Sequence, residues 1–300
     1  MRYRVTHRTT YHGRQTVSIG HNQAWLEPRP VPSQHLESFS LTISPEPSIR
    51  SRRTDFFGNP VTAFSFNEGY EQLEVTATTL VTVTPPTEHT VSQEQASEPW
   101  EQVLLRTRQH ADRESREACQ FVCASPRVMW CREMQKYARH SFSAGRPILE
   151  ALHDLTQRIH EDFVYDSRAT TVTTPVQEVF RIRRGVCQDF AHLQIALLRS
   201  IGLPARYISG YLRTVSAEGA PRLVGADASH AWLSVCCGQA GWVDTDPTNN
   251  RFISDDHICL AWGRDYSDVP PLTGVFIGGG QHRLRVEVDV VPLPVAGPSF

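Results

Sequence analysis

The segment that follows Cys187 constrains the fold of this chain most, because its pattern is that of a helix with an apolar face to bury. Apolar residues recur along it at helical spacing. They are Phe190, Leu193, Leu197 and Ile201, with Ala196 and Leu198 beside them. Gly202 and Pro204 come directly afterwards, where a helix is expected to stop. The sequence therefore predicts a helix from about residue 187 to residue 201.

Strand patterns and a second helix surround this segment. Residues 205–212 and 231–235 are predicted to be short strands, and residues 241–246 lead into a turn at the proline that follows. Residues 147–163 repeat apolar side chains at helical spacing. Residues 283–291 alternate apolar and polar side chains, which is typical of a strand. This mixture of helices and strands predicts an α+β fold.

The first 85 residues have a different pattern, in which apolar and polar residues alternate. Residues 56–60 (FFGNP) are a turn signal between two such runs. We expect an antiparallel β domain here, with a sandwich as one form it could take. The predicted division of the chain is a β domain at 1–85, a helical connecting segment at 86–145, the main core at 146–275, and a C-terminal strand and tail at 276–300.

Charge, hydropathy and cysteine number narrow the partners and the compartment that we expect for this chain. The formal net charge is −2, so electrostatics gives no reason to expect nucleic acid or an anionic membrane as a partner. There is no apolar run of about 18 residues, so no membrane span is predicted. The N-terminal residues lack the apolar region of a secretory signal, which makes the cytoplasm the expected compartment. Seven cysteines, an odd number, indicate reduced thiols rather than a disulfide framework.

Three residues that are far apart in the chain could form one reactive site. Cys187 stands at the start of the predicted helix, His230 at the start of a strand and Asp246 at the end of another. A helix N-terminus stabilises a thiolate, and a nearby histidine can take the thiol proton. A carboxylate behind the histidine holds its tautomer and stabilises the imidazolium. Unpaired N–H groups at the helix start could hold an oxyanion, so the set suits acyl transfer through a thioester.

Each of these residues has an ordinary structural explanation when it is taken alone. A cysteine in a helix is usually a small buried hydrophobe, and Asp-Pro-Thr is usually a turn. The prediction of a reactive site therefore depends on the combination, the order and the placement of all three.

The chain resembles the bacterial branch of the transglutaminase-like superfamily. Residues 181–213 (RIRRGVCQDFAHLQIALLRSIGLPARYISGYLR) are similar to the segment that carries the nucleophile in that family. Residues 229–232 (SHAW) and 241–248 (GWVDTDPT) match its histidine and aspartate segments. Residues 262–274 (WGRDYSDVPPLTG) resemble the continuation usual in this branch, and residues 1–85 resemble the β domain that commonly precedes the core.

The resemblance implies a fold related to papain-like cysteine proteases, in which the helix carrying the nucleophile packs on an antiparallel sheet. It implies Cys187 as nucleophile, His230 as base and Asp246 as the group that orients the base. Asp246 matches because it immediately precedes Pro-Thr, whereas Asp244, two residues earlier, is expected to point the other way. The additional oxyanion donor of the family, a tryptophan in animal transglutaminases, has no match. Gln188 stands where the animal enzymes have a tryptophan, so their substrate preference is not carried over.

Other polar residues are given structural explanations or left outside the site. Asp189 is expected to be a helix-start carboxylate. Asp227 and Ser229 flank the approach to the histidine and could border a substrate cleft. The cysteines within residues 119–131 do not have the spacing of a common zinc site, and no metal or cofactor is predicted. At residues 236–237, one cysteine is expected in the core and the other partly exposed.

The function expected from these features is cysteine-dependent acyl transfer at an amide bond of a peptide or protein substrate. Hydrolysis is preferred because a bacterial cytoplasm rarely needs protein cross-linking. Transfer to an amine, as in a transglutaminase, would use every residue named above. A catalytically inert binding or scaffold module is the alternative of another class. A metal-dependent hydrolase lacks the ligand spacing, and the oligomeric state does not follow from the sequence.

Overall fold

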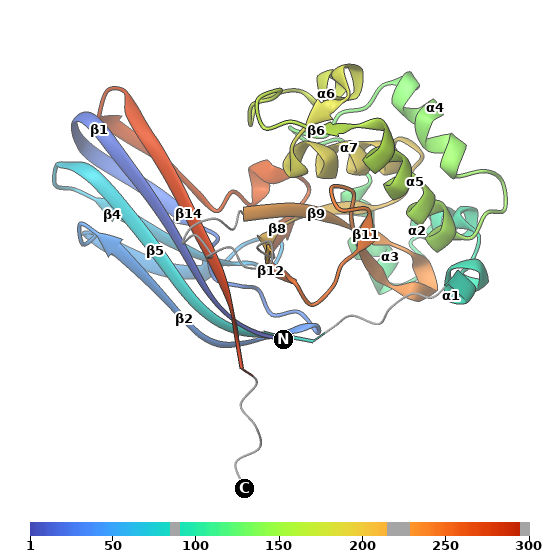
Figure 1. The fold of residues 1–300 in the computed structure, drawn as a ribbon, viewed down its shortest axis with the longest axis horizontal. Coiled ribbons are helices and arrows are strands. Elements are labelled where there is room, and N and C mark those ends of the chain that lie inside the picture. Colours follow the sequence, from blue (N-terminus) through green and yellow to red (C-terminus); the bar gives the residue numbers. More distant parts are fainter. Residues whose placement is uncertain (85–90, 215–228, 295–300) are drawn as a thin grey trace, which may run out of the picture.

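The chain folds into two lobes, a curved sheet and a mixed α+β lobe, which lie side by side (Figure 1). This computed structural model describes residues 1–84, 91–214 and 229–294. The predicted end of the β domain at residue 85 and the loop at Asp227 lie outside the described residues. None of the described helices is long and apolar enough to cross a membrane.

The curved sheet contains the N-terminal strands. They are β1 (Arg2–Ala24), β2 (Gln34–Ser44), β3 (Ile49–Thr54), β4 (Pro60–Phe66) and β5 (Tyr70–Val83). The strand order is β2-β5-β1-β4-β3, with β13 (Leu272–Gly278) and β14 (His282–Leu293) also paired with β1. All of these pairings are antiparallel, as expected.

The described strands of this lobe form one seven-stranded sheet and not a sandwich. The reason is the length of β1, which has 23 residues. Its first half pairs with β5 and β14, and its second half pairs with β4 and β13, so one strand joins both parts into a single sheet. Strands β13 and β14, from beyond residue 271, therefore complete the N-terminal sheet. The domain boundaries inferred from the sequence remain predictions.

Two glycine turns shape this sheet, and the first lies within the turn signal at residues 56–60. Gly58 lies between β3 and β4 with φ of 82°, and Asp55 Oδ1 accepts the N–H groups of Phe57 and Asn59 at 2.8 Å each. The run of residues 278–280 connects β13 to β14, and all three glycines have positive φ. Backbone of this kind favours glycine because a Cβ atom would be strained there.

The second lobe contains the helices and a five-stranded antiparallel sheet. The helices are α1 (Val91–Ala96), α2 (Trp100–Gln109), α3 (Arg113–Ala118), α4 (Arg132–Ser141), α5 (Ile148–Asp162), α6 (Val176–Ile182) and α7 (Cys187–Ser200). The strands are β8 (Ala205–Leu212), β9 (Ser229–Cys236), β10 (Trp242–Asp246), β11 (Arg251–Phe252) and β12 (His257–Gly263), in the order β11-β10-β9-β8-β12. A two-stranded parallel pair, β6 (Val164–Tyr165) and β7 (Arg184–Gly185), precedes α7.

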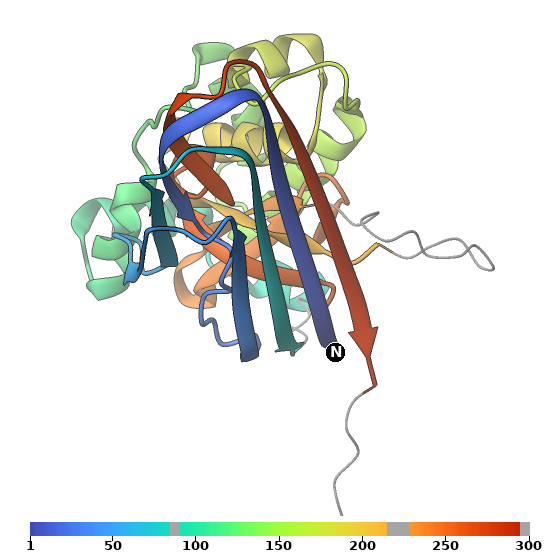
Figure 2. The same cartoon turned by 90° about the vertical axis from the view of Figure 1, so that its left-hand side faces the viewer.

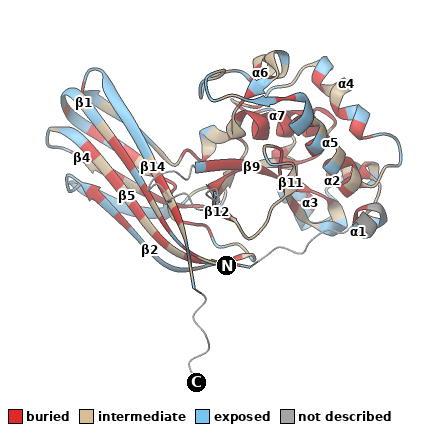
Figure 3. Ribbon diagram, in the orientation of Figure 1, coloured by how far each residue is buried: buried red, intermediate tan, exposed pale blue. Residues whose placement is uncertain are grey.

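Helix α7 is the buried centre of this lobe, as its apolar stripe predicted. Every residue from 189 to 200 is buried, and Figure 3 shows most of α7 and β9 as buried. Leu233 of β9 belongs to the same core cluster as α7, whereas Trp232 and Ile208 belong to a separate small cluster. Because neighbours in a strand face opposite sides, the sheet has one face on α7 and another face that carries Trp232.

Polar contacts hold the two lobes together. His7 Nδ1 of the curved sheet lies 2.9 Å from the Tyr211 hydroxyl in β8. Gln34 Nε2 donates to the Cys259 carbonyl at 2.7 Å, and the Cys259 N–H donates back to Gln34 Oε1 at 3.0 Å. Viewed from the side, the curved sheet lies in front of the helices and the second sheet (Figure 2). The sheet therefore covers one side of the lobe that carries the predicted reactive residues.

Candidate functional site

Local geometry determines where α7 begins, and with it the position of the cysteine. Val186 has extended backbone, and its N–H donates to Asp189 Oδ2 at 2.9 Å. Thr170 Oγ1 donates to the same oxygen at 2.5 Å. A Cβ atom on Gly185 would lie 2.7 Å from that oxygen and 2.8 Å from the Asp189 Cβ, so this position requires glycine. Asp189 is thus a helix-start carboxylate, as expected, and burial raises its pKa.

Cys187 is half-buried at the start of α7, next to the first free amides of the helix. The helical hydrogen bonds begin with the Phe190 N–H, which donates to the Val186 carbonyl at 3.0 Å. The amides of Cys187 and Gln188 therefore precede the ladder and have no acceptor within the helix. Amides in this position are suited to an oxyanion that forms beside the sulfur.

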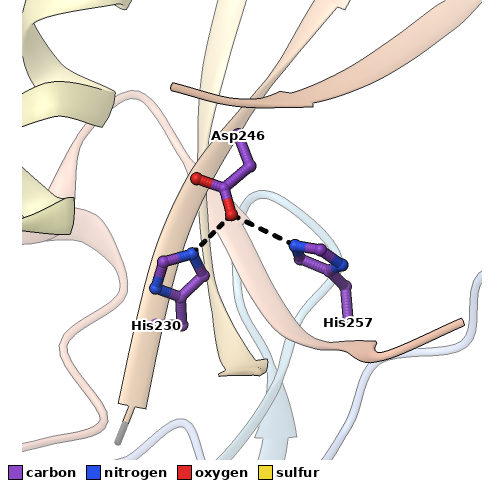
Figure 4. Close-up of side chains that lie close together, drawn as sticks. All are labelled: His230, Asp246 and His257. Carbon is purple, nitrogen blue, oxygen red and sulfur yellow. Dashed lines mark hydrogen bonds and ion pairs between the residues drawn. The ribbon is translucent and has the colours of Figure 1, made fainter. Parts of the chain in front are cut away.

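His230, the second residue of β9, connects the thiol to a carboxylate. Its Nε2 lies 2.7 Å from Asp246 Oδ2 (Figure 4). Cys187 lies near enough to the His230 ring to raise its pKa. Since Nε2 is used by Asp246, Nδ1 is the ring nitrogen available to the thiol. Burial lowers the pKa of His230, but the nearby Asp246 and Cys187 outweigh it and raise that pKa to about 10.

Asp246, the last residue of β10, is fully buried and receives several donors. Its Oδ1 accepts the N–H groups of Thr248 at 3.0 Å and Asn249 at 3.3 Å. Its Oδ2 accepts the Asn249 side-chain amide at 2.6 Å, in addition to His230. Burial by itself would raise the pKa of Asp246, but the donors, His230 first, hold it well below its usual range. The turn after β10 therefore keeps this carboxylate ionised and in place.

The expectation that Asp244 points the other way is wrong. Residues two apart in a strand face the same side of the sheet, so Asp244 shares the face of Asp246. Asp244 Oδ2 accepts the indole N–H of Trp232 at 3.1 Å. Its position along the strand, and not its face, separates it from His230.

A second histidine, His257, belongs to the site and was not found from the sequence. Its Nε2 lies 3.2 Å from Asp246 Oδ2, on the other side of the carboxylate from His230 (Figure 4). Its Nδ1 accepts the Ser254 N–H at 3.2 Å, so the proton of the neutral ring is on Nε2 and points to Asp246. Burial lowers the pKa of His257, which favours this neutral form. Nothing in the sequence around His257 marks it, because it follows a turn and joins β12 rather than a known motif.

His230, Asp246 and His257 offer three potential metal ligands within 4.8 Å of one another. The donor set does not fit a metal ion, however. The Nε2 of His257 carries a proton because Nδ1 accepts a backbone N–H, and Asp246 already accepts bonds on both oxygens. The geometry therefore favours a hydrogen-bonded line over a metal site.

The remaining predicted residues take other places. Ser229 is exposed at the start of β9, and Asp227 lies outside the described residues. Within residues 91–214, the cysteines at 119–131 belong to no group of three metal-ligating side chains. Both Cys236 and Cys237 are buried, which corrects the expectation that one is partly exposed. The reason is that the strand ends at Cys236, so the alternation of faces stops there.

Comparisons with known proteins agree with this arrangement. Residues 3–82 match the family described as the bacterial transglutaminase-like N-terminal region, and residues 135–247 match the transglutaminase-like superfamily. An uncharacterised protein of Mycobacterium tuberculosis is 39% identical over 296 residues, which cover 97% of this chain and 93% of the relative. A protein-glutamine gamma-glutamyltransferase of Pseudomonas aeruginosa is 34% identical over 98 residues, which cover 31% of this chain and 15% of the relative.

A solved structure has the same fold. It is the crystal structure of a candidate cysteine protease from Cytophaga hutchinsonii, with a TM-score of 0.75 and 21% identity, covering 100% of this chain and 94% of that one. Both matched family regions, their order and the shared α+β architecture lead to one assignment. The chain belongs to the transglutaminase-like superfamily, with a bacterial transglutaminase-like N-terminal region ahead of its core.

Proposed function

We propose that this protein cleaves an amide bond of a peptide or protein through a thioester on Cys187, with water as the acceptor. The observation that supports this most is the His230–Asp246 pair, with Cys187 at the start of α7 near enough to raise the pKa of His230. A thiol, an imidazole and an ionised carboxylate in that order are the parts that acyl transfer requires.

The first half of the reaction forms the acyl-enzyme. The Cys187 proton passes to His230 Nδ1, and the sulfur attacks the amide carbon while the carbonyl oxygen becomes an oxyanion. The amides of Cys187 and Gln188 are placed to donate to that oxyanion. When the intermediate collapses, the C–N bond breaks, and the leaving amine takes the proton from His230.

The second half restores the enzyme. His230 takes a proton from water, and the hydroxide attacks the thioester carbon. The C–S bond then breaks, the carboxylic acid leaves, and the proton on His230 returns to the sulfur. Asp246 stays ionised throughout and stabilises the imidazolium, which is consistent with its lowered pKa.

An amine in place of water would give transfer instead of hydrolysis, and one observation favours keeping this second candidate. The relative that is named as a protein-glutamine gamma-glutamyltransferase matches 31% of this chain. The same residues would act in both reactions, and the acceptor alone would differ. The cytoplasmic compartment likewise remains a prediction.

Alkylation tests whether the thiol is activated. The protein is treated with less than one equivalent of iodoacetamide between pH 5 and 9, and the modified cysteine is identified by peptide mass mapping. Cys123 is the matched control because it is an exposed free cysteine outside the site. We expect Cys187 to react first and to stay reactive below pH 7. Equal rates of alkylation at Cys187 and Cys123 would contradict an ion pair between the Cys187 thiolate and the His230 imidazolium, and would favour a catalytically inert module.

A peptide library with and without an added primary amine tests the reaction itself. Hydrolysis yields cleaved or deamidated peptides in both mixtures, whereas transfer yields amine adducts in the second. We expect Cys187→Ala to abolish either product while Cys123→Ala retains it. Product formation by Cys187→Ala with an unchanged circular dichroism spectrum would rule out the mechanism.

A further inference from the structure

A large groove lies on the face of the second sheet that does not contact α7. It has a volume of about 1140 Å³ and is lined by residues of strands β8, β9, β10 and β12 and by the stretch 31–34 from the other lobe. Three indoles line it, those of Trp232, Trp242 and Trp262. A groove of this size could hold several residues of a peptide.

The positive charge among the residues that line this groove is on Arg206. Its guanidinium carbon lies 4.0 Å from the centre of the Trp242 ring and 3.6 Å from that of the Trp262 ring. Its Nε is buried and has no hydrogen-bond partner. Since both flat faces of the guanidinium are covered by indoles, only its N–H edge remains for a polar partner. Burial lowers the pKa of Arg206 to about 10, opposed in part by Asp244.

Arg199 shows how a buried arginine with a structural role is satisfied in this fold. Its Nε and one terminal nitrogen donate to the Ala205 carbonyl at 3.1 and 2.8 Å, and its other nitrogen reaches the Cys123 carbonyl at 3.0 Å. Among the residues that the structure describes, Arg206 has no ion pair or hydrogen bond of this kind to a protein acceptor. A carboxylate edge-on to its guanidinium would supply the missing acceptors.

Charges of opposite sign stand at the edge of the same groove. Glu114 and Glu117 of α3 are exposed and line it, as does Asp255. A ligand that carries both a carboxylate and an amine would complement this arrangement. Its carboxylate could bind Arg206, and its amine could lie near the acidic residues at the edge. A peptide with free termini has this pattern, and its side chains could lie on the indoles.

We propose that this groove binds a short peptide by its C-terminal carboxylate, with Arg206 as the anion-binding residue. The groove shares walls with the predicted reactive site. Trp232 stacks on His230 with a ring separation of 6.2 Å, and His257, which contacts Asp246, also lines the groove. A bound peptide would therefore touch two side chains that support the His230–Asp246 pair. This binding does not depend on the acyl-transfer chemistry.

The test measures binding in the Cys187→Ala full-length protein, so that turnover cannot interfere. The probe is the tripeptide Ala-Ala-Phe, added as the free acid or as the C-terminal amide, with tryptophan fluorescence and calorimetry as readouts. We expect the free acid to bind at least ~10-fold more tightly than the amide, because a charge-assisted hydrogen bond is lost in the amide. Acetylation of the amine should weaken binding by a smaller factor, ~2–3-fold, since the acidic residues are exposed.

The same binding measurements are then made on the Arg206→Gln variant. Glu117→Gln, at the edge of the groove, is the matched control. We expect Arg206→Gln to remove the preference for the free acid, and Glu117→Gln to keep it. Thermal denaturation checks that Arg206→Gln is folded, and the comparison of acid and amide on the parent protein does not need that variant. Equal affinity for acid and amide, or no binding of either up to about 1 mM, would overturn the proposal.

Discussion

Strand β10 carries two carboxylates that have different partners although they share a face of the sheet. Asp246, at the end of the strand, faces His230 and His257 and the amides of the following turn. Asp244, in the middle of the strand, faces the Trp232 indole. The pKa of Asp246 is lowered by its donors, whereas burial raises the pKa of Asp244.

This difference shows that burial alone does not decide the charge of an acid. Both carboxylates are withdrawn from water, which disfavours ionisation in each. At Asp246, imidazole and amide donors outweigh that effect, so the acid can act as a permanent anion behind His230. At Asp244, the charge of Arg206 and the Trp232 indole donor do not outweigh it. The donors at the end of the strand therefore explain why Asp246 can serve as the anion of the candidate site, whereas Asp244 on the same strand cannot.

Replacing each acid in turn should give the largest contrast. We expect Asp246→Asn to lower kcat/KM by ~10³-fold or more, because the amide cannot hold the tautomer or stabilise the imidazolium. Asp244→Asn, the matched control on the same strand, should change it less than ~5-fold. The measurement is steady-state kinetics on a peptide identified in the library screen. Similar losses in both variants would mean that the strand end has no special role.

Removing the second histidine should have an intermediate effect. His257→Phe keeps the ring volume but loses the N–H donated to Asp246, so kcat/KM should fall by ~10-fold or more. His257→Gln retains an N–H donor and should lose less. The pH–rate profile distinguishes positioning from mere packing. Without the His257 N–H, the Asp246 carboxylate is more basic and stabilises the imidazolium more strongly, so the pKa of His230 should rise and the active pH range should shift. An unchanged profile in His257→Phe would contradict this role.

The pH dependence of stability should report the His230–Asp246 pair. The pKa of His230 is raised to about 10 in the folded protein, so its contribution is complete below pH 6.5 and is lost as the pH rises toward 10. We expect the difference in unfolding free energy between wild type and His230→Asn to shrink over that interval, by up to ~1.4 kcal/mol per pH unit. Chemical denaturation at pH 6, 8 and 10 measures it. A constant difference would indicate that His230 is not ion-paired.

The smallest expected effect is on stability at low pH, where Asp246 and Asp244 should contribute with opposite signs. The contribution of Asp246 to stability is lost as the pH falls through its lowered folded pKa, because the unfolded chain then binds the proton more readily. Asp244 has the opposite sign, since its raised pKa favours protonation in the folded state. Relative to Asp244→Asn, wild type should therefore gain stability as the pH falls, by an amount on the order of 1 kcal/mol. Thermal melts at pH 4 to 7 check the sign, and parallel curves would refute it.

Much of the fold followed from local patterns. The apolar stripe after Cys187 predicted α7, and the alternation in residues 205–212 predicted β8 with the observed ends. The turn signal at residues 56–60 predicted the turn between β3 and β4. The single curved sheet did not follow, because a two-residue period identifies strands but not which strands pair. Strand β14 lies far from β1 in sequence and pairs with it along most of its length.

The candidate site divides in the same way. Residue types and their order were sufficient to select Cys187, His230 and Asp246, since a helix start, a strand start and a strand end each leave a recognisable mark in sequence. His257 and Asn249 left no such mark, because their importance lies in reaching Asp246 across strands and around a turn. The amino-acid sequence by itself determined which chemical groups this protein has and which local elements carry them. The tertiary structure alone decided which buried acid meets donors, because hydrogen bonds between distant residues depend on packing geometry that no local pattern contains.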